Sequence, residues 1–223
     1  ETDLNAPLIW NTKAPRKTKI FAWLLFKDRL NTRANLAHKQ IISTDICPCC
    51  AMFPEDSMHL FITCPLASHV WQRVDILPQT DDIADHWDVP LPHHLPHKTW
   101  PLVLMSLLWK IWAPRNDILF RNIDKCSVIT LRALISDLDL WSHRLMATCD
   151  KEDISSWHSY LSARCIVPFN SDSLPRRLSI SSVTARQVLI SSEDDAVWFL
   201  AKRYIVSNCH GSAGQGQNIF YYT

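Results

Sequence analysis

The chain has almost no glycine. Gly211, Gly214 and Gly216 are its three glycines, and all of them lie in the last thirteen residues. Glycine adopts positive φ at little cost, and tight β-hairpin turns depend on positive φ. The first 210 residues therefore disfavour hairpins and favour helices, with thirteen prolines to separate them. We expect a mostly α fold.

The chain also lacks an apolar run long enough to cross a bilayer. Its longest, residues 102–112, is interrupted by Ser106 and Lys110, whereas a spanning helix needs about 20 apolar residues. No apolar leader segment precedes the cysteines, and four of the eight cysteines are scattered singly. This usage is typical of reduced thiols inside a cell. We expect an intracellular protein, nuclear or cytoplasmic, with no membrane partner.

Catalytic motifs are missing as well. The glycine content excludes a glycine-rich phosphate loop. A polymerase needs paired carboxylates on a strand hairpin to hold its metal ions. Asp81 and Asp82 instead lie in a proline-rich stretch, and Asp194 and Asp195 begin a predicted helix. We expect no enzymatic activity.

What the chain does contain is a cluster of metal ligands. Cys47, Cys50, His59 and Cys64 follow the pattern C-x2-C-x8-H-x4-C. Three thiolates and one imidazole satisfy the tetrahedral preference of a structural Zn2+ ion, and the short first loop lets two thiolates reach one ion. Cys49 is an alternative to Cys50, although a C-x-C loop would strain the site. The sequence predicts a zinc site with these ligands.

The second ligand pair is predicted to lie on a helix. Ser57 is the expected N-cap, His59 falls in the first turn, and Pro65 follows Cys64. Five residues of α-helix rotate by about 500°, which leaves the two ligands about 140° apart around the helix axis. The helix is therefore expected to end or loosen before Cys64, as the following proline favours.

Positive charge is concentrated in one stretch. The net charge of the chain is +1, whereas residues 11–40 hold eight basic residues against Asp28 alone, a local charge of +7. We predict that this stretch contacts the phosphates of RNA or single-stranded DNA, with Trp10 or Trp23 stacking on bases. A solvated helix surface explains the same charges equally well. The eight predicted nucleic-acid-binding residues are Lys13, Arg16, Lys17, Lys19, Lys27, Arg29, Arg33 and Lys39.

Apolar periodicity and capping residues predict the order of the helices. Pro114 is expected to break one of them near Ala113. The predicted helices span residues 15–30, 33–39, 66–74, 102–120, 127–146, 150–161 and 192–207. The predicted domains are a small zinc-stabilised helical domain (1–76), a proline-rich linker (77–100), a second helical unit (101–163) and a poorly ordered tail (164–223).

Several segments resemble a known family. They are IWNTKAPRKTKIFAWLL (Ile9 to Leu25), DRLNTRANLAHKQI (Asp28 to Ile41), CPCC, PEDSMHLFITCP and VWQRV, in that order. Together they resemble the zinc-binding domain that follows the reverse transcriptase in plant LINE-type (non-LTR) retrotransposons. The later segment LLWKIWAPRNDILF is similar to the helical region that often follows in these elements, except at Ala113 and Pro114.

The resemblance implies a zinc ion and a role with nucleic acid in retrotransposition. We therefore predict a non-catalytic, zinc-binding and nucleic-acid-binding module derived from a non-LTR retrotransposon polyprotein. The alternative is a protein-interaction module in which zinc is purely structural and the tryptophan-rich second half contacts another chain. The acidic balance after residue 40 favours this alternative.

Overall fold

The computed structural model describes residues 5–78, 87, 89–121, 127–145 and 147–166. In this part of the chain the regular structure is helical, and the β-pairing consists of one isolated bridge between Ile46 and Pro54. The mostly α fold class is thus confirmed. The elements are α1 (Asn5–Trp10), α2 (Arg16–Phe26), α3 (Arg33–His38), the π-helical turn η1 (His59–Thr63), α4 (Pro65–Val74), the 3-10 turn η3 (His97–Thr99), α5 (Trp100–Arg121), α6 (Ser127–Ser142) and α7 (Thr148–Ile166).

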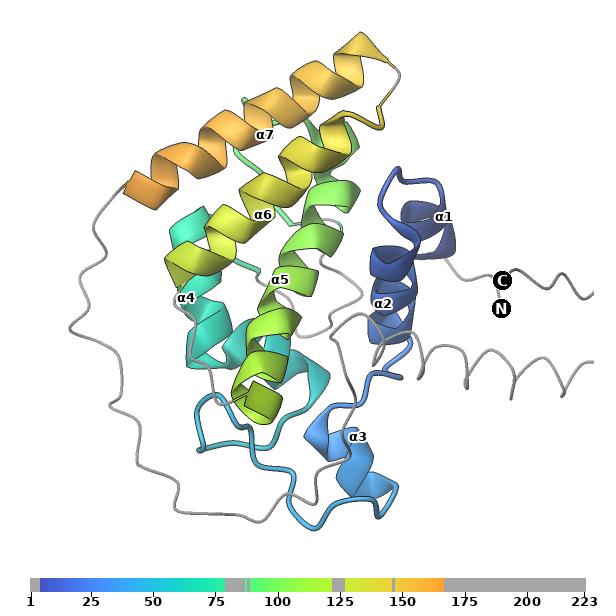
Figure 1. Cartoon of the computed structure of the whole chain (residues 1–223), viewed down its shortest axis with the longest axis vertical. Helices are drawn as coiled ribbons and strands as arrows, with labels where there is room; N and C mark the ends of the chain where they lie inside the picture. The colour runs from blue at the N-terminus through green and yellow to red at the C-terminus, as the bar shows by residue number, and fades with distance from the viewer. Residues whose placement is uncertain (1–4, 79–86, 88, 122–126, 146, 167–223) are drawn as a thin grey trace, which may run out of the picture. The chain divides into compact units, whose positions relative to one another are not determined.

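Helix α5 lies at the centre of the fold (Figure 1). It packs against α2 on one side and against α6 on the other, and α6 packs in turn against α4 and α7. The turn η1 contacts both α4 and α5. The helices from α1 to α7 belong to one packed unit. Among them, none combines the length and hydropathy that crossing a membrane requires.

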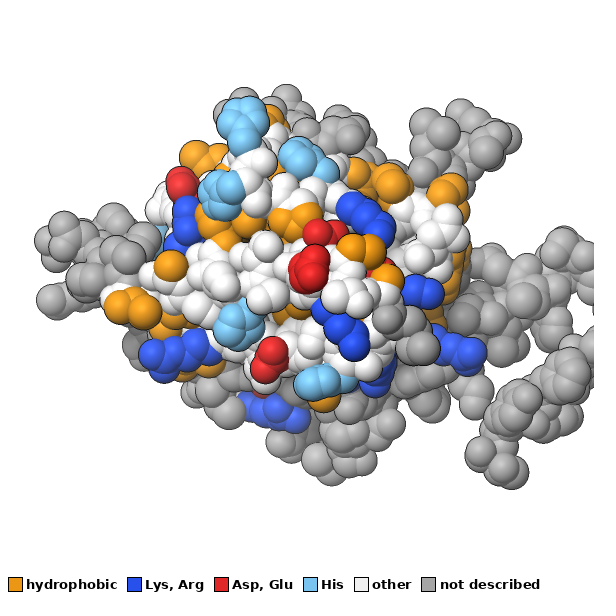
Figure 2. All heavy atoms as spheres, turned by 90° about the horizontal axis from the view of Figure 1, so that it is seen from above, with side chains coloured by type: hydrophobic (Ala, Val, Ile, Leu, Met, Phe, Trp, Pro, Cys, Tyr) orange, Lys and Arg blue, Asp and Glu red, His pale blue; other side chains and the backbone are white. Residues whose placement is uncertain are grey.

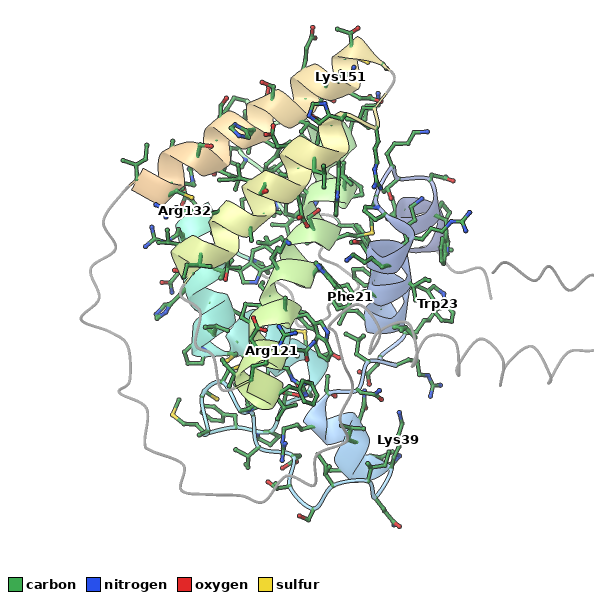
Figure 3. All side chains as sticks on the ribbon, in the orientation of Figure 1. Phe21, Trp23, Lys39, Arg121, Arg132 and Lys151 are labelled. Carbon is green, nitrogen blue, oxygen red and sulfur yellow. The ribbon has the colours of Figure 1, made fainter. Side chains whose placement is uncertain are left out.

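Apolar side chains at helical spacing build the core. Every residue of α5 from 102 to 108 is buried, and α6 presents Leu131, Leu134 and Leu138 as one buried stripe. Phe21 points from α2 toward α5, where its ring centroid lies 5.2 Å from that of Trp109, whereas Trp23 lies on the other side of α2 (Figure 3). Burying one large apolar side chain contributes about 1.5–3 kcal/mol. This packing is therefore the main source of stability in the helical core.

Helices α2, α3 and α4 end next to left-handed residues that carry a Cβ atom, Asp28, Gln40 and Asp75. At the end of α2, the Asp28 amide donates to the Leu25 carbonyl at 2.9 Å and the Arg29 amide donates to the Leu24 carbonyl at 2.7 Å. This is the Schellman arrangement, which normally uses glycine. Each left-handed residue with a Cβ atom costs roughly 1–2 kcal/mol. The non-glycine residues with positive φ in the described chain are Asp28, Gln40, Ala51 and Asp75.

Most predicted helices are present, with corrected ends. The helices at 33–39 and 66–74 are confirmed as α3 and α4, and the Thr32 hydroxyl caps α3 by accepting from the Asn35 amide at 3.2 Å. The helix predicted to reach residue 30 ends at Phe26, because Asp28 is left-handed. Helix α6 ends four residues before its predicted end, and α7 extends five residues beyond its predicted end.

The break expected near Ala113 is wrong. Helix α5 runs without interruption from Trp100 to Arg121 and contains Pro114. A proline inside a helix costs roughly 3 kcal/mol. Trp112, two residues before the proline, and Arg115, directly after it, are buried and packed against other elements, and this packing outweighs the cost.

The proline-rich stretch contributes to the core. Trp87, Val89, Leu91 and Leu95 are buried, and the Trp87 ring lies 4.6 Å from the ring of Phe26 on α2. Helices before and after the stretch also pack against each other, α2 with α5 and α4 with α6. Separate folding of 1–76 and 101–163 stays a prediction. The helix predicted at 192–207 and most of the predicted tail lie outside the described residues.

Candidate metal centre

The four predicted ligands come together at one place. One ligand atom from each of Cys47, Cys50, His59 and Cys64 lies within 4.8 Å of the other three. The Sγ atoms of Cys47 and Cys64 are 4.0 Å apart, and Cys50 Sγ lies 3.3 Å from His59 Nε2. Tetrahedral zinc with Zn–S bonds of about 2.3 Å holds two sulfurs about 3.8 Å apart. The donor set and its spacing therefore fit a Zn2+ ion.

A short loop presents the first two cysteines. The Cys47 amide donates to the Phe53 carbonyl at 2.8 Å, and the Ala51 amide donates to the Cys47 carbonyl at 2.8 Å. Ala51 has a φ of 58°, which turns the chain back after Cys50. The Cys49 amide donates to Cys47 Sγ at 3.4 Å. This contact holds the Cys47 sulfur on the inner side of the loop, next to the Cys64 sulfur.

His59 and Cys64 lie at the two ends of a π-helical turn. The Cys64 amide donates to the His59 carbonyl at 2.6 Å, an i→i+5 hydrogen bond. This wider turn places residues five apart on one side, whereas an α-helix would splay them. The loosening of the helix before Cys64, predicted from the ligand spacing, is confirmed.

The cap of this helix is not the predicted one. Asp56 Oδ1 accepts from the His59 amide at 2.6 Å and caps the turn. Ser57, the predicted N-cap, donates its hydroxyl instead to Asp28 Oδ1 at 2.9 Å. Both residue types cap helices well, so sequence alone chose wrongly between two adjacent candidates. The Ser57 contact connects the metal loop, residues 43–64, to the end of α2.

The imidazole of His59 is oriented by a residue that the sequence did not single out. Thr63 Oγ1 lies 3.3 Å from His59 Nδ1, and the Phe53 ring lies 5.7 Å from the His59 ring. When Nδ1–H donates to the hydroxyl, the lone pair of Nε2 faces Cys50 and is available to a metal. The signal in the sequence is the four-residue spacing from His59 to Thr63, which places them on one face of a helical turn.

The thiols differ in how readily they lose a proton. Hydrogen bonds from the side chains of Cys47 and Cys49, helped by backbone N–H groups in the first turn of α4, lower the pKa of the Cys64 thiol to about 3. Hydrogen bonds to Cys47 and Cys64 raise the pKa of the Cys49 thiol, and burial raises that of Cys50. Cys64 is thus the most acidic of these thiols. Cys49 lies outside the group of four ligands.

A buried ion pair lies against the metal loop. The guanidinium of Arg115 on α5 donates to both carboxylate oxygens of Glu55, from Nε at 3.1 and 3.0 Å. The two side chains are 3% and 0% exposed. Sequence reasoning missed this pair, since sixty residues separate its members and no local pattern joins them.

The eight predicted nucleic-acid-binding residues separate into two groups at opposite ends of α2, a helix about 16 Å long. Lys19 Nζ donates to the Trp10 carbonyl at 2.9 Å in the first group, and Arg33 Nη2 donates to the Thr44 carbonyl at 3.0 Å in the second. The first group is Lys13, Arg16, Lys17 and Lys19, and the second is Lys27, Arg29, Arg33 and Lys39. Lys17, Lys19 and Arg33 are half-buried and the others are exposed.

Histidines of the described chain other than His59 lie outside this group of ligands. His93, His94 and His97 are exposed. Figure 2 shows several histidines on the face seen from above, among side chains of both charge signs. None of them joins a group of metal ligands in the described part of the chain.

Comparison with known proteins agrees with this geometry for part of the chain. No curated protein and no solved structure matches the chain. A family model matches its first third, which contains all four candidate ligands. Residues 1–71 are similar to the family described as zinc-binding in reverse transcriptase.

Proposed function

We propose that this chain carries a non-catalytic, zinc-binding module that binds single-stranded nucleic acid and derives from a non-LTR retrotransposon polyprotein. The observation that carries the proposal is the group of three cysteines and one histidine within 4.8 Å. Zinc bound there by Cys47, Cys50, His59 and Cys64 supplies folding free energy to the loop. The match of residues 1–71 to a zinc-binding family of reverse transcriptases supports the origin.

The nucleic-acid contact is proposed for the end of α2 that lies next to α1. The first turns of α2 hold Arg16, Lys17 and Lys19 and no acidic residue. Basic residues there oppose the positive end of the helix dipole, so the arrangement costs stability without an anionic partner. Burial lowers the pKa of Lys19, and the charges of Lys13 and Arg16 lower it further.

An aromatic side chain borders these cations. Trp10 is 46% exposed at the end of α1, and its carbonyl accepts from Lys19. Exposed aromatic rings beside a basic surface are the usual platform for unpaired bases, and each stacked base is worth about 1–3 kcal/mol. We therefore place a base on Trp10 and phosphates on Lys13, Arg16, Lys17 and Lys19, of which Lys13 and Arg16 are the more exposed.

The salt dependence of binding tests this proposal. Four phosphate contacts to a single strand give a slope of about −3 for log K against log salt, at roughly −0.7 per contact. Replacing Lys13, Arg16, Lys17 and Lys19 by glutamine should remove most of that slope. The matched control replaces Arg132, Arg144 and Lys151, exposed cations on or next to α6 and α7, and should leave the slope unchanged.

Zinc content and helicity must be equal in the variants, because Lys17 Nζ also lies 5.7 Å from the Trp109 ring. A second variant, Trp10→Ala, should weaken binding by about 5- to 150-fold, the equivalent of one stacked base. Its control is Phe120→Ala, which removes an aromatic ring that is 72% exposed on α5.

The protein-interaction alternative has one observation in its favour. Ile46, Met52 and Phe53 on the metal loop are 39%, 49% and 55% exposed. Against it, Trp100, Trp112, Trp141 and Trp157 are buried in the chain's own core, so these tryptophans of the second half offer little surface to a partner. A wild-type protein that binds no nucleic acid at low salt would favour this alternative.

A further inference from the structure

Helix α5 lies outside residues 1–71 and still contacts the metal loop. We propose that Arg115 of α5 is a positioning residue of the metal centre, which acts through the buried carboxylate of Glu55 to hold the two ligand pairs at binding distance. This inference rests on the proposed zinc site. It adds a requirement that the family match does not contain, because the residue that completes the site follows the matched segment by more than forty positions.

Arg115 is held from several sides. Besides its bonds to Glu55, its Nη2 donates to the Asn31 carbonyl at 3.4 Å, and its Nη1 donates to Asn116 Oδ1 at 3.0 Å. Its guanidinium carbon lies 4.7 Å from the centroid of the Trp112 ring. A planar guanidinium that donates to both oxygens of a carboxylate fixes the orientation of the carboxylate as well as its position.

Glu55 connects Arg115 to the first ligand pair, Cys47 and Cys50. Its amide donates to the Asp45 carbonyl at 2.8 Å, in the same pairing of chain segments that joins Cys47 to Phe53. Its Oε1 also accepts from the Arg33 amide at 2.9 Å, at the start of α3. The carboxylate thus sits at the base of the loop that presents Cys47 and Cys50.

Glu55 is also close in sequence to the second ligand pair, His59 and Cys64. Asp56, the next residue, caps the turn on which His59 lies. The rest of that turn rests on α5 through Phe61, whose ring lies 6.2 Å from the Trp112 ring in a stacked arrangement. Phe61 is between His59 and Cys64 in sequence and is 0% exposed. Arg115 and Trp112, three residues apart, therefore support both ligand pairs from one helix.

The consequence is a measurable dependence of metal affinity on α5. Losing a residue that orients metal ligands typically lowers affinity 10- to 100-fold. In the full chain we expect Arg115→Met to weaken Zn2+ binding within this range, measured by competition with a chromophoric chelator. Arg115→Lys keeps the charge and loses the bidentate geometry, so it should restore only part of the affinity.

Arg115→Met leaves a buried carboxylate without its partner and can prevent folding. The double variant Glu55→Gln with Arg115→Met removes both charges, and it should fold and still bind zinc at least about 10-fold more weakly than wild type. Cobalt absorption bands should also shift, because the ligand geometry changes. The control is Lys110→Met, which breaks the 2.9 Å ion pair of α5 with Asp137 on α6 and leaves the loop's own contacts in place.

Wild-type affinity in the double variant would overturn the inference, and so would an equal loss of affinity in Lys110→Met. If Arg115→Met fails to fold, the double variant decides. A wild-type chain that binds no zinc would contradict the proposed function itself, which is a separate result. The expected pattern is wild-type affinity for Lys110→Met, an intermediate value for Arg115→Lys, and the weakest binding for the variants that carry methionine at 115.

Discussion

The metal loop, residues 43–64, and the helices α5 to α7 are held together by different forces. The loop exposes several of its apolar side chains and uses hydrogen bonds, the Glu55–Arg115 ion pair and four metal ligands. The helices bury a continuous set of leucines and tryptophans, with Leu134, Leu138 and Trp157 at 0% exposure. We therefore expect the metal loop to depend on an ion bound by its candidate ligands, whereas the helices are stabilised by their own apolar packing.

Removing the metal should have the largest effect, and it should destabilise the metal loop far more than the helices α6 and α7. Structural zinc supplies on the order of 10 kcal/mol in small sites. With a chelator, we expect amides of residues 43–64 to lose protection from hydrogen exchange, while those of α6 and α7 keep theirs. Elemental analysis should show one zinc per chain before treatment. An unchanged melting curve after chelation would refute the metal dependence of the loop.

Two neighbouring cysteines sharpen the assignment of the ligands. Cys50→Ser removes a thiolate from the group of four and should lower zinc affinity by more than the 10- to 100-fold that loss of an orienting residue costs. Cys49→Ser should change it by only a few-fold, because Cys49 lies outside that group and its amide, which donates to Cys47 Sγ, is kept in the variant. The reverse outcome would make Cys49 the ligand.

A core substitution should affect the helical region alone. Leu138→Ala, at a fully buried position of α6, should cost about 2–5 kcal/mol in the free energy of unfolding and leave zinc affinity unchanged. Leu140→Ala, 60% exposed on the same helix, should stay within about 0.5 kcal/mol. Denaturant unfolding measures both. A loss of zinc affinity in Leu138→Ala would mean that the two regions are coupled more widely than through Arg115 and Trp112.

The smallest effect tests the backbone of the metal loop. Ala51 has a φ of 58°, so Ala51→Gly should stabilise the zinc-loaded protein by about 0.5–1 kcal/mol. The same substitution inside α3, Ala34→Gly, should instead cost about 1 kcal/mol. Opposite shifts in Tm for the two variants are the expected result. Equal destabilisation would show that Ala51 is not strained.

The local features were predictable from sequence because each has a local cause. Ligand spacing predicted the four candidate metal ligands and a helical turn that loosens before Cys64. Low glycine content predicted the helical fold, and apolar periodicity with capping residues predicted the start of α3 at Arg33. The eight basic residues were identified as a set, and their positions in the sequence also predicted that they lie toward the two ends of the helix.

The remaining features depend on contacts between distant segments. A rule for isolated helices predicted a break at Pro114, and burial of Trp112 and Arg115 overrides that rule. The pairing of Glu55 with Arg115 follows from how α5 packs against the loop, which no local pattern reveals. The choice of Asp56 over Ser57 as the cap depended on Asp28, which takes the Ser57 hydroxyl.

The π-helical turn between His59 and Cys64 has a consequence for how this sequence can vary. Its i→i+5 hydrogen bond fixes the number of residues between the two ligands at four. Deleting one of them would rotate Cys64 by about 100° around the helix axis and carry its sulfur away from the other three ligands. Substitutions inside the turn change packing, but insertions and deletions change which atoms can meet. At this point the length of the chain is under stronger constraint than the identity of its side chains.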